Sequence, residues 1–287
     1  MSGLRALAGA AGALMLAMVV LMNGPSLRVA LDPAANTIRL ASAQANEALH
    51  VAMGGTMPPA QPKQPQPIVV PDPALAMQAD AAVRLRGKIP PELYAYFDVF
   101  LYVSKAAEGS LAQHMYVFHK DRADDLAFEQ SFPVSTGRER REKYLTSTPV
   151  GLFELDPNRF ERMHYSRTWG GAAMPYAMFL DATIRGRQTG VALHSSGYRH
   201  AALLGSRASG GCVRLPPEKA AELFERFHAE EQGRVPVFAY DAAHRRTNGD
   251  GLIERDASGQ PILTDGYRVL LFIEDYPGGP ALVAVVA

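Results

Sequence analysis

The chain has 287 residues, 47% of them hydrophobic, which supplies a core for one large domain or two small ones. Its 29 basic residues balance its 29 acidic residues, and this balance argues against nucleic acid as a partner. The chain has a single cysteine, which excludes an internal disulfide. Because a lone thiol is a reactivity risk in an exported protein, its presence there would favour a chemical use.

The first 45 residues have the layout of a secretory signal peptide or an N-terminal membrane anchor. A short basic start, residues 1–5, precedes the uncharged run 6–22, and Ala-x-Ala sequences end at Ala43 and Ala45. The run is slightly shorter than the roughly 20 apolar residues that span a bilayer core, so cleavage and anchoring both stay open. Either way we expect export to the periplasm or cell envelope, with the inner membrane as a possible contact of the N-terminus.

Residues 46–78 form a proline-rich segment, which favours extended chain and predicts a linker. Residues 79–96 are interpreted as a short helical lead-in, because residues 74–86 are rich in alanine and residues 90–92 read Pro-Pro-Glu. The main folded region is expected to follow at residues 97–240.

Short apolar and aromatic segments separated by turn residues dominate this region. Strands are predicted at residues 97–104, 114–120, 126–135, 152–155, 178–182, 190–194 and 234–240. Many short strands indicate a mainly β fold, either a β-sandwich or an open barrel, rather than alternating βα units. Residues 138–143 (RERREK) are interpreted as a solvated loop.

One prominent helix is predicted at residues 216–232. It begins at a proline, carries an apolar stripe at helical spacing and ends at Gly233; the stripe consists of Ala220, Leu223, Phe224 and Phe227. Residues 241–287 form a C-terminal extension without an assigned role. Strands are expected there at 267–273 and 282–286, which would add to the sheet or cover one side of a cleft.

The stretch 191–215, VALHSSGYRHAALLGSRASGGCVRL, contains the cysteine, Cys212, and an upstream histidine, His194. Small residues surround the thiol, and glycines let a backbone turn tightly. A thiol with an imidazole available as a base suits acyl transfer through a thioester. A lone cysteine can instead be a small buried hydrophobe.

The arrangement of His194 followed by Ser209-Gly-Gly-Cys212-Val-Arg214 resembles the active-site signature of the L,D-transpeptidase catalytic domain, the YkuD-like family. Three more segments resemble family landmarks and occur in the family's order: PVSTG (133–137), TPVGLFEL (148–155) and MPYAMFL (174–180). The resemblance extends over residues 97–240. Two positions depart from it, since many members have histidine at the position of Gly210 and glycine at that of Ser195.

The resemblance implies a peptidoglycan L,D-transpeptidase without a cofactor, with Cys212 as nucleophile and His194 as general base and acid. His194 is expected to take the thiol proton and form an ion pair with Cys212. The donor would be a stem peptide, cleaved between an L-centre such as meso-diaminopimelate and a terminal D-alanine. An amine from a second stem peptide would then resolve the thioester to form a 3→3 cross-link. Water in its place would make the enzyme an L,D-carboxypeptidase.

Further residues receive supporting assignments. The resemblance implies that the Ser195 carbonyl orients His194, and backbone N–H groups around Gly211 and Cys212 would stabilise the oxyanion. Four side chains have two open interpretations each: Ser209 contacts substrate or shapes the turn, Arg214 binds a substrate carboxylate or fixes the loop, and Met174 and Tyr176 line the acceptor side or pack in the core. Trp169, in a glycine-rich loop, is either a lid aromatic or a surface hydrophobe.

Two other functions compete with this interpretation. A zinc peptidase would use His194, His200 and Cys212, but the stretch has neither HExxH-type spacing nor a carboxylate base, so no metal is expected. A cell-wall-binding module without catalysis would use Cys212 structurally. It would not need a nucleophile in a glycine-rich turn.

Overall fold

The computed structural model describes residues 20–22, 27–29, 72–141 and 146–279. The chain divides into two compact units, residues 1–67 and 68–287. In the first unit, β1 (Val20–Met22) and β2 (Leu27–Val29) pair antiparallel. The rest of the predicted signal or anchor, and residues 46–71 of the predicted linker, lie outside the described residues. The end of the predicted linker, residues 73–78, is helical instead and belongs to the helix that starts at Pro73. Within the described ranges, no helix is both long and apolar enough to cross a membrane.

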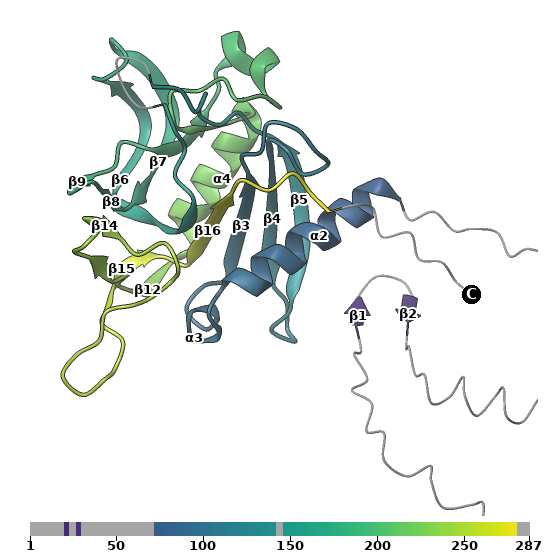
Figure 1. Ribbon diagram of the computed structural model, residues 1–287, viewed down its shortest axis with the longest axis vertical. Coiled ribbons are helices and arrows are strands. Elements are labelled where there is room, and N and C mark those ends of the chain that lie inside the picture. Colours follow the sequence, from purple (N-terminus) through teal and green to yellow (C-terminus); the bar gives the residue numbers. More distant parts are fainter. Residues whose placement is uncertain (1–19, 23–26, 30–71, 142–145, 280–287) are drawn as a thin grey trace, which may run out of the picture. The chain divides into compact units, whose positions relative to one another are not determined.

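The second unit is built on an eight-stranded sheet with the order β11-β10-β7-β6-β16-β3-β4-β5 (Figure 1). Its strands are β3 (Val99–Ser104), β4 (His114–Lys120), β5 (Leu126–Pro133), β6 (Gly151–Ser166), β7 (Ala172–Asp181), β10 (Ala192–Ser195), β11 (Val213–Leu215) and β16 (Val269–Glu274). Neighbours pair antiparallel except β10 with β11 and β16 with β3. The mainly β fold predicted from the sequence is confirmed.

The two ends of this strand order meet. Ser135 follows β5 and forms an antiparallel bridge with Arg214 of β11. The Ser135 N–H donates to the Arg214 carbonyl at 3.0 Å, and the Arg214 N–H donates to the Ser135 carbonyl at 2.9 Å. The sheet is therefore closed at the strand that follows Cys212, which fixes this segment from both sides.

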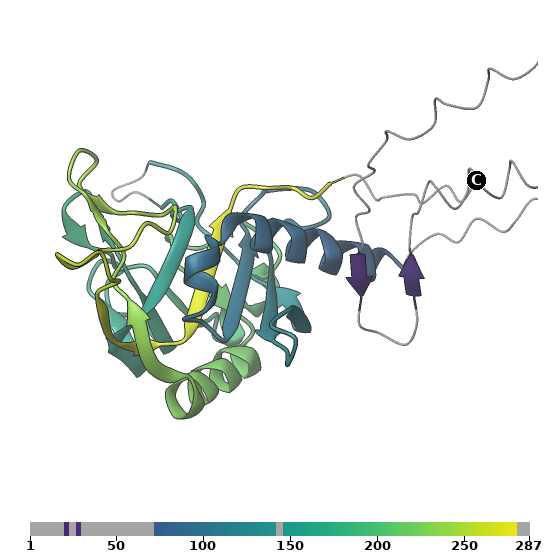
Figure 2. The same cartoon turned by 90° about the horizontal axis from the view of Figure 1, so that it is seen from below.

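Helices cover opposite faces of the sheet (Figures 1 and 2). Helix α4 (Pro217–Glu230) buries the apolar stripe predicted for it against a core that includes Leu101 and Leu271. Helices α2 (Pro73–Lys88) and α3 (Pro91–Tyr94) pack on a second core that includes Phe100. Because successive strand residues point to opposite faces, Phe100 and Leu101 of β3 serve these two cores.

The C-terminal part contributes the strand β16 to the middle of the sheet, between β6 and β3. One strand was expected at 267–273, whereas the structure has two, β15 (Leu263–Tyr267) and β16. They separate at Arg268, because β15 pairs with β12 (Gln232–Pro236) while β16 pairs with β3. The strand expected at 282–286 lies outside the described residues.

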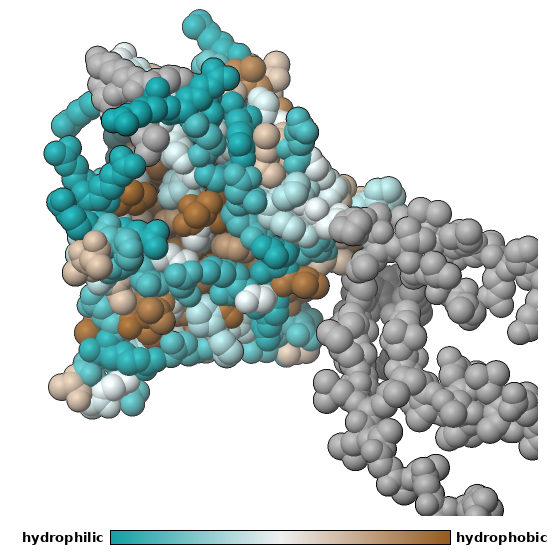
Figure 3. Space-filling model, in the orientation of Figure 1, coloured by the Kyte–Doolittle hydropathy of each residue, from teal (hydrophilic) through white to brown (hydrophobic). Residues whose placement is uncertain are grey.

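Smaller elements complete the unit. Strands β8 (Thr183–Ile184) and β9 (Arg187–Gln188) form one pair, and β13 (Tyr240–Asp241) and β14 (Arg246–Thr247) form another. A 3-10 helix, η1 (Tyr198–Leu203), follows β10. On the face drawn in Figure 3, hydrophobic residues occur in small groups bordered by hydrophilic ones, as is usual for a surface in contact with water.

Candidate active site

Parallel pairing of β10 with β11 brings the histidine and cysteine segments together. His194 pairs with Arg214, and Leu193 pairs with Val213. Leu193 and Val213 face the core beneath α4, whereas Cys212 packs with Ala192 in a separate cluster on the other face. By alternation, His194 lies on the same face as Cys212. Strand geometry puts the two Cα atoms roughly 8 Å apart, which the two side chains can bridge.

His194 is held by its neighbour's backbone. Its Nδ1 lies 2.7 Å from the Ser195 carbonyl oxygen, and the residue is 6% exposed. A neutral imidazole that donates from Nδ1 keeps its free lone pair on Nε2, where it can accept a proton. Burial lowers the pKa of His194 to about 4, and the positive charge of Arg214 acts in the same direction.

Cys212 is partly exposed and packs against a small cluster that includes Met174 and Phe179. Its Sγ lies 3.7 Å from the Gly190 carbonyl oxygen. Burial raises the pKa of the Cys212 thiol, while the Ala192 N–H and the charge of Arg214 oppose that shift only in part. The shifts of the thiol and of His194 therefore both favour an uncharged thiol beside an uncharged imidazole.

Ser209 shapes the turn before Cys212. Its hydroxyl donates to the Cys212 carbonyl at 2.5 Å and accepts the Gly211 N–H at 3.0 Å. Gly211 has a φ of +123°, which favours glycine. Its N–H is thus already paired, whereas no hydrogen bond found among the described residues uses the N–H of Cys212. The Cys212 N–H is the better placed of the two expected oxyanion donors.

The remaining predicted side chains lie on different sides of the sheet. Arg214 is half-buried, and its Nη1 lies 3.5 Å from the Ala208 carbonyl oxygen, a contact that ties the loop to β11. Met174 is buried in the cluster that contacts Cys212. Tyr176 packs edge-on against Phe224 of α4, with ring centres 5.7 Å apart. It therefore contributes to the core rather than to the face that carries Cys212.

Trp169 lies over the loop of the cysteine. A Cβ atom added to Gly210 would meet two carbons of the Trp169 indole at 2.6 Å. The Arg138 guanidinium lies 5.6 Å from the centre of the same ring system. Trp169 is 37% exposed and is thus a surface hydrophobe, and its ring covers Gly210. This is the position where many members of the family that the sequence resembles carry a histidine.

His200 belongs to η1 and is exposed. Among the residues that the structure describes, no group of three or more His, Cys, Asp or Glu side chains is arranged to hold a metal ion. The geometry thus gives no support to the set of His194, His200 and Cys212 as zinc ligands.

Sequence reasoning missed a partly buried ion pair next to the site. Lys105 is 6% exposed, and its Nζ lies 3.0 Å from Oε1 of Glu139. Glu139 belongs to the charged segment that was interpreted as solvated, but its carboxylate accepts hydrogen bonds from Ser147 and Thr148. The only sequence signal was the landmark that begins at Thr148, since the charge run itself is typical of a surface loop.

Comparison with known proteins agrees with this geometry. Residues 104–238 match the family of the L,D-transpeptidase catalytic domain, YkuD. This part of the chain is thus similar to the L,D-transpeptidase catalytic domain. No curated protein matches the chain.

Two similar solved structures are L,D-transpeptidases. The LD transpeptidase LdtMt1 in complex with imipenem is 17% identical, with 62% of this chain and 59% of that chain covered and a TM-score of 0.35. An L,D-transpeptidase from Mycobacterium smegmatis is 16% identical, with the same coverage and a TM-score of 0.33. The chain spans about three fifths of the length of these structures.

Proposed function

We propose that the protein is a peptidoglycan L,D-transpeptidase that forms a thioester between Cys212 and a stem-peptide donor. The observation that carries the proposal is the register of β10 and β11, with Cys212 and His194 on one face and Nδ1 of His194 bound to the Ser195 carbonyl. The match of residues 104–238 to the L,D-transpeptidase catalytic domain supports the same chemistry.

In the first half-reaction, Sγ of Cys212 attacks the carbonyl carbon that precedes the terminal D-alanine. Nε2 of His194 takes the thiol proton, and the carbonyl π electrons move to the oxygen, which the Cys212 N–H stabilises. Collapse of the tetrahedral intermediate breaks the C–N bond. His194 returns the proton to the leaving amine, so D-alanine departs and the thioester remains.

In the second half-reaction, an amine of another stem peptide attacks the thioester carbonyl. His194 accepts a proton from this amine, the C–S bond breaks, and the proton returns to the Cys212 sulfur. The product is a 3→3 cross-link. Water in place of the amine gives an L,D-carboxypeptidase on the same residues.

The pKa shifts indicate when the proton moves. A neutral His194 and a neutral Cys212 thiol are the favoured resting forms, because burial lowers the pKa of one and raises that of the other. Proton transfer therefore accompanies the attack on substrate. This differs from an ion pair formed in advance.

Mass spectrometry of muropeptides incubated with the purified protein tests the proposal. We expect cross-linked dimers and released D-alanine from the unaltered protein, and neither from Cys212→Ala. Tripeptide products without dimers would favour the carboxypeptidase. Wall binding without turnover, unaffected by Cys212→Ala, would favour the non-catalytic module and contradict the proposal. Activity at the cell wall also requires export, which the N-terminal sequence predicts.

A further inference from the structure

The peptide bond between Gly211 and Cys212 is held by a hydroxyl from another segment. Oγ1 of Thr148 donates to the Gly211 carbonyl oxygen at 2.8 Å. Thr148 is fully buried, so the carbonyl points into the protein. In a planar trans peptide the C=O and the following N–H point in opposite directions. The hydroxyl of Thr148 thereby fixes the direction of the Cys212 N–H.

The hydroxyl of Thr148 can donate its hydrogen bond to only one acceptor. Oγ1 of Thr148 also accepts the Gly137 N–H at 2.8 Å. A threonine hydroxyl has one donor, and the contact with Gly137 occupies it as an acceptor. Its O–H is therefore committed to the Gly211 carbonyl. The side chain of Thr148 bridges two backbone groups, one from the segment after β5 and one from the segment before β11.

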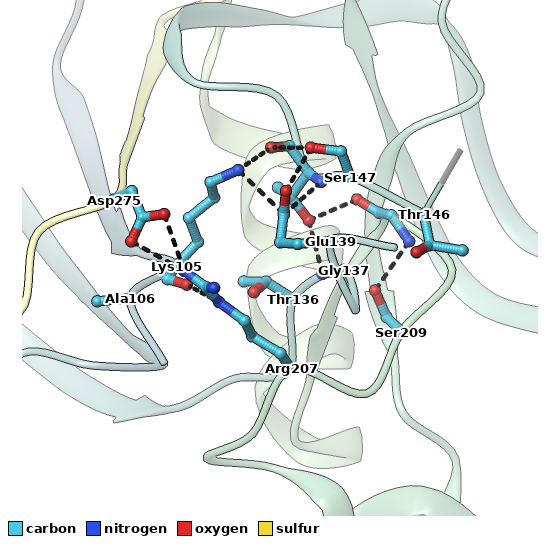
Figure 4. Close-up of polar contacts among 12 residues, drawn as sticks. Lys105, Ala106, Thr136, Gly137, Glu139, Thr146, Ser147, Arg207, Ser209 and Asp275 are labelled. Atoms are coloured by element: carbon cyan, nitrogen blue, oxygen red, sulfur yellow. Dashed lines mark hydrogen bonds and ion pairs between the residues drawn. The ribbon is translucent and has the colours of Figure 1, made fainter. Parts of the chain in front are cut away.

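Lys105 and Glu139, whose side chains point toward each other in Figure 4, both hold the backbone of Thr148. Its N–H donates to Oε1 of Glu139 at 3.0 Å, and its carbonyl accepts from Nζ of Lys105 at 2.7 Å. Ser147 donates to Oε2 of the same carboxylate at 2.5 Å. The Glu139 carboxylate thus accepts from Ser147, Thr148 and Lys105. These contacts hold the backbone of Thr148 in place.

We infer that Thr148 is a positioning residue, which aims the Cys212 N–H at the oxyanion of the tetrahedral intermediate and is itself held by Lys105 and Glu139. The inference rests on the proposed function, because it assumes acyl transfer at Cys212. Thr148 acts through the Gly211–Cys212 peptide and does not contact the substrate.

The test compares two reactions of the same sulfur. Acylation by imipenem or by a tetrapeptide donor passes through an oxyanion, whereas alkylation by iodoacetamide does not. In Thr148→Val we expect acylation to slow by about 10- to 100-fold, within the loss typical of a weakened oxyanion donor, with KM nearly unchanged. Alkylation should change by less than about twofold, because the thiol and His194 are untouched. Thr148→Ser, which keeps the hydroxyl, should recover most of the acylation rate.

Thr146→Val is the matched control. Thr146 is also fully buried, but its hydroxyl bonds only to the backbone of Arg140 among the described residues. In Thr146→Val, the ratio of the acylation rate to the alkylation rate should equal that of the unaltered protein. If the valine variant at position 148 does not fold, Thr148→Ala carries the same comparison.

Two results would overturn the inference: unchanged acylation in Thr148→Val, or an equal slowing of acylation and alkylation, which indicates a general structural effect. A different result would overturn the proposed function instead. In that case the unaltered protein would be alkylated at Cys212 but acylated by neither reagent.

Discussion

Burial acts on the two reactive side chains in complementary ways. It raises the pKa of the Cys212 thiol and lowers that of His194 to about 4, so each charged form is disfavoured. The motif alone suggests an ion pair, since the sequence shows two groups of suitable type but not their desolvation. The neutral resting pair is a property of the folded protein.

The pH dependence of thiol alkylation checks this state. Because iodoacetamide reacts with the thiolate, the alkylation rate at Cys212 should keep rising with pH beyond the ordinary thiol pKa of about 8.5. His194→Asn serves as the control and should change the profile little, since the imidazole is already neutral above pH 6. A plateau near neutral pH in the unaltered protein would instead indicate a preformed ion pair.

Gly210 and Trp169 are in close contact, and this contact can be tested by substitution. The added methyl group of Gly210→Ala would lie 2.6 Å from the indole and force the ring away. We expect a loss of about 1–3 kcal/mol in the free energy of unfolding, as for other overpacked sites, together with a shift in tryptophan emission. Trp169 is the only tryptophan, so its fluorescence reports directly.

The Trp169→Ala background provides the control for this pair. In that background Gly210→Ala should lower the free energy of unfolding only slightly, because the indole ring that the methyl group would contact is absent. An equal cost in both backgrounds would show that the tight contact does not determine stability.

At the scale of elements, strands β6 and β7 place two acidic side chains directly opposite each other. Glu154 pairs with Asp181 across the strands, and like charges in this position are destabilising. Glu154 is buried, and its Oε1 has no hydrogen-bond partner among the residues that the structure describes. Burial first and Asp181 second raise the pKa of Glu154 well above its usual range. The protonated form is therefore the one that suits the fold.

This shift predicts a pH-dependent stability. A carboxyl whose pKa is raised on folding contributes stability that is complete below the unfolded pKa and is lost as pH rises through the folded pKa. Between pH 5 and 8, the free energy of unfolding should therefore fall less with rising pH in Glu154→Gln than in the unaltered protein. Denaturant titrations at several pH values measure the difference. Parallel curves for the two proteins would contradict the raised pKa.

The elements differ in how far the sequence predicts them. The strand at 114–120 and the helix after Cys212 were well predicted, because their hydrophobic patterns are local. β6 extends to Ser166, far beyond the predicted 152–155, since its outer part pairs with β7 while exposing polar side chains such as Arg162. Pairing with a partner strand, rather than local pattern, defines that part of the hairpin.

For the whole molecule, β16 joins the residues beyond position 240 to the centre of the sheet. Leu271 is fully buried and pairs with Leu101 of β3 and Phe153 of β6. Local sequence identifies this segment as a strand but does not reveal its neighbours, which lie far away in the chain. Likewise, the motif identifies Cys212 and His194, whereas the Lys105–Glu139 pair joins two separate segments of the chain that local sequence does not bring together.

Leu271→Ala tests whether this segment is integral to the domain. We expect a loss of about 2–5 kcal/mol in the free energy of unfolding, from lost burial and the cavity left behind. Leu252→Ala is the matched control, because Leu252 belongs to the same C-terminal part but is 60% exposed. Equal unfolding midpoints for the two variants in denaturant would contradict the central role of β16.

The most direct test of the account is the intact mass of the protein quenched with acid during reaction with a tetrapeptide donor and no acceptor. The account predicts a tripeptide acyl adduct that maps to Cys212, disappears when an amine acceptor is added, and never forms in Cys212→Ala. Turnover of the donor by Cys212→Ala at the rate of the unaltered protein, with no adduct on either, would contradict it.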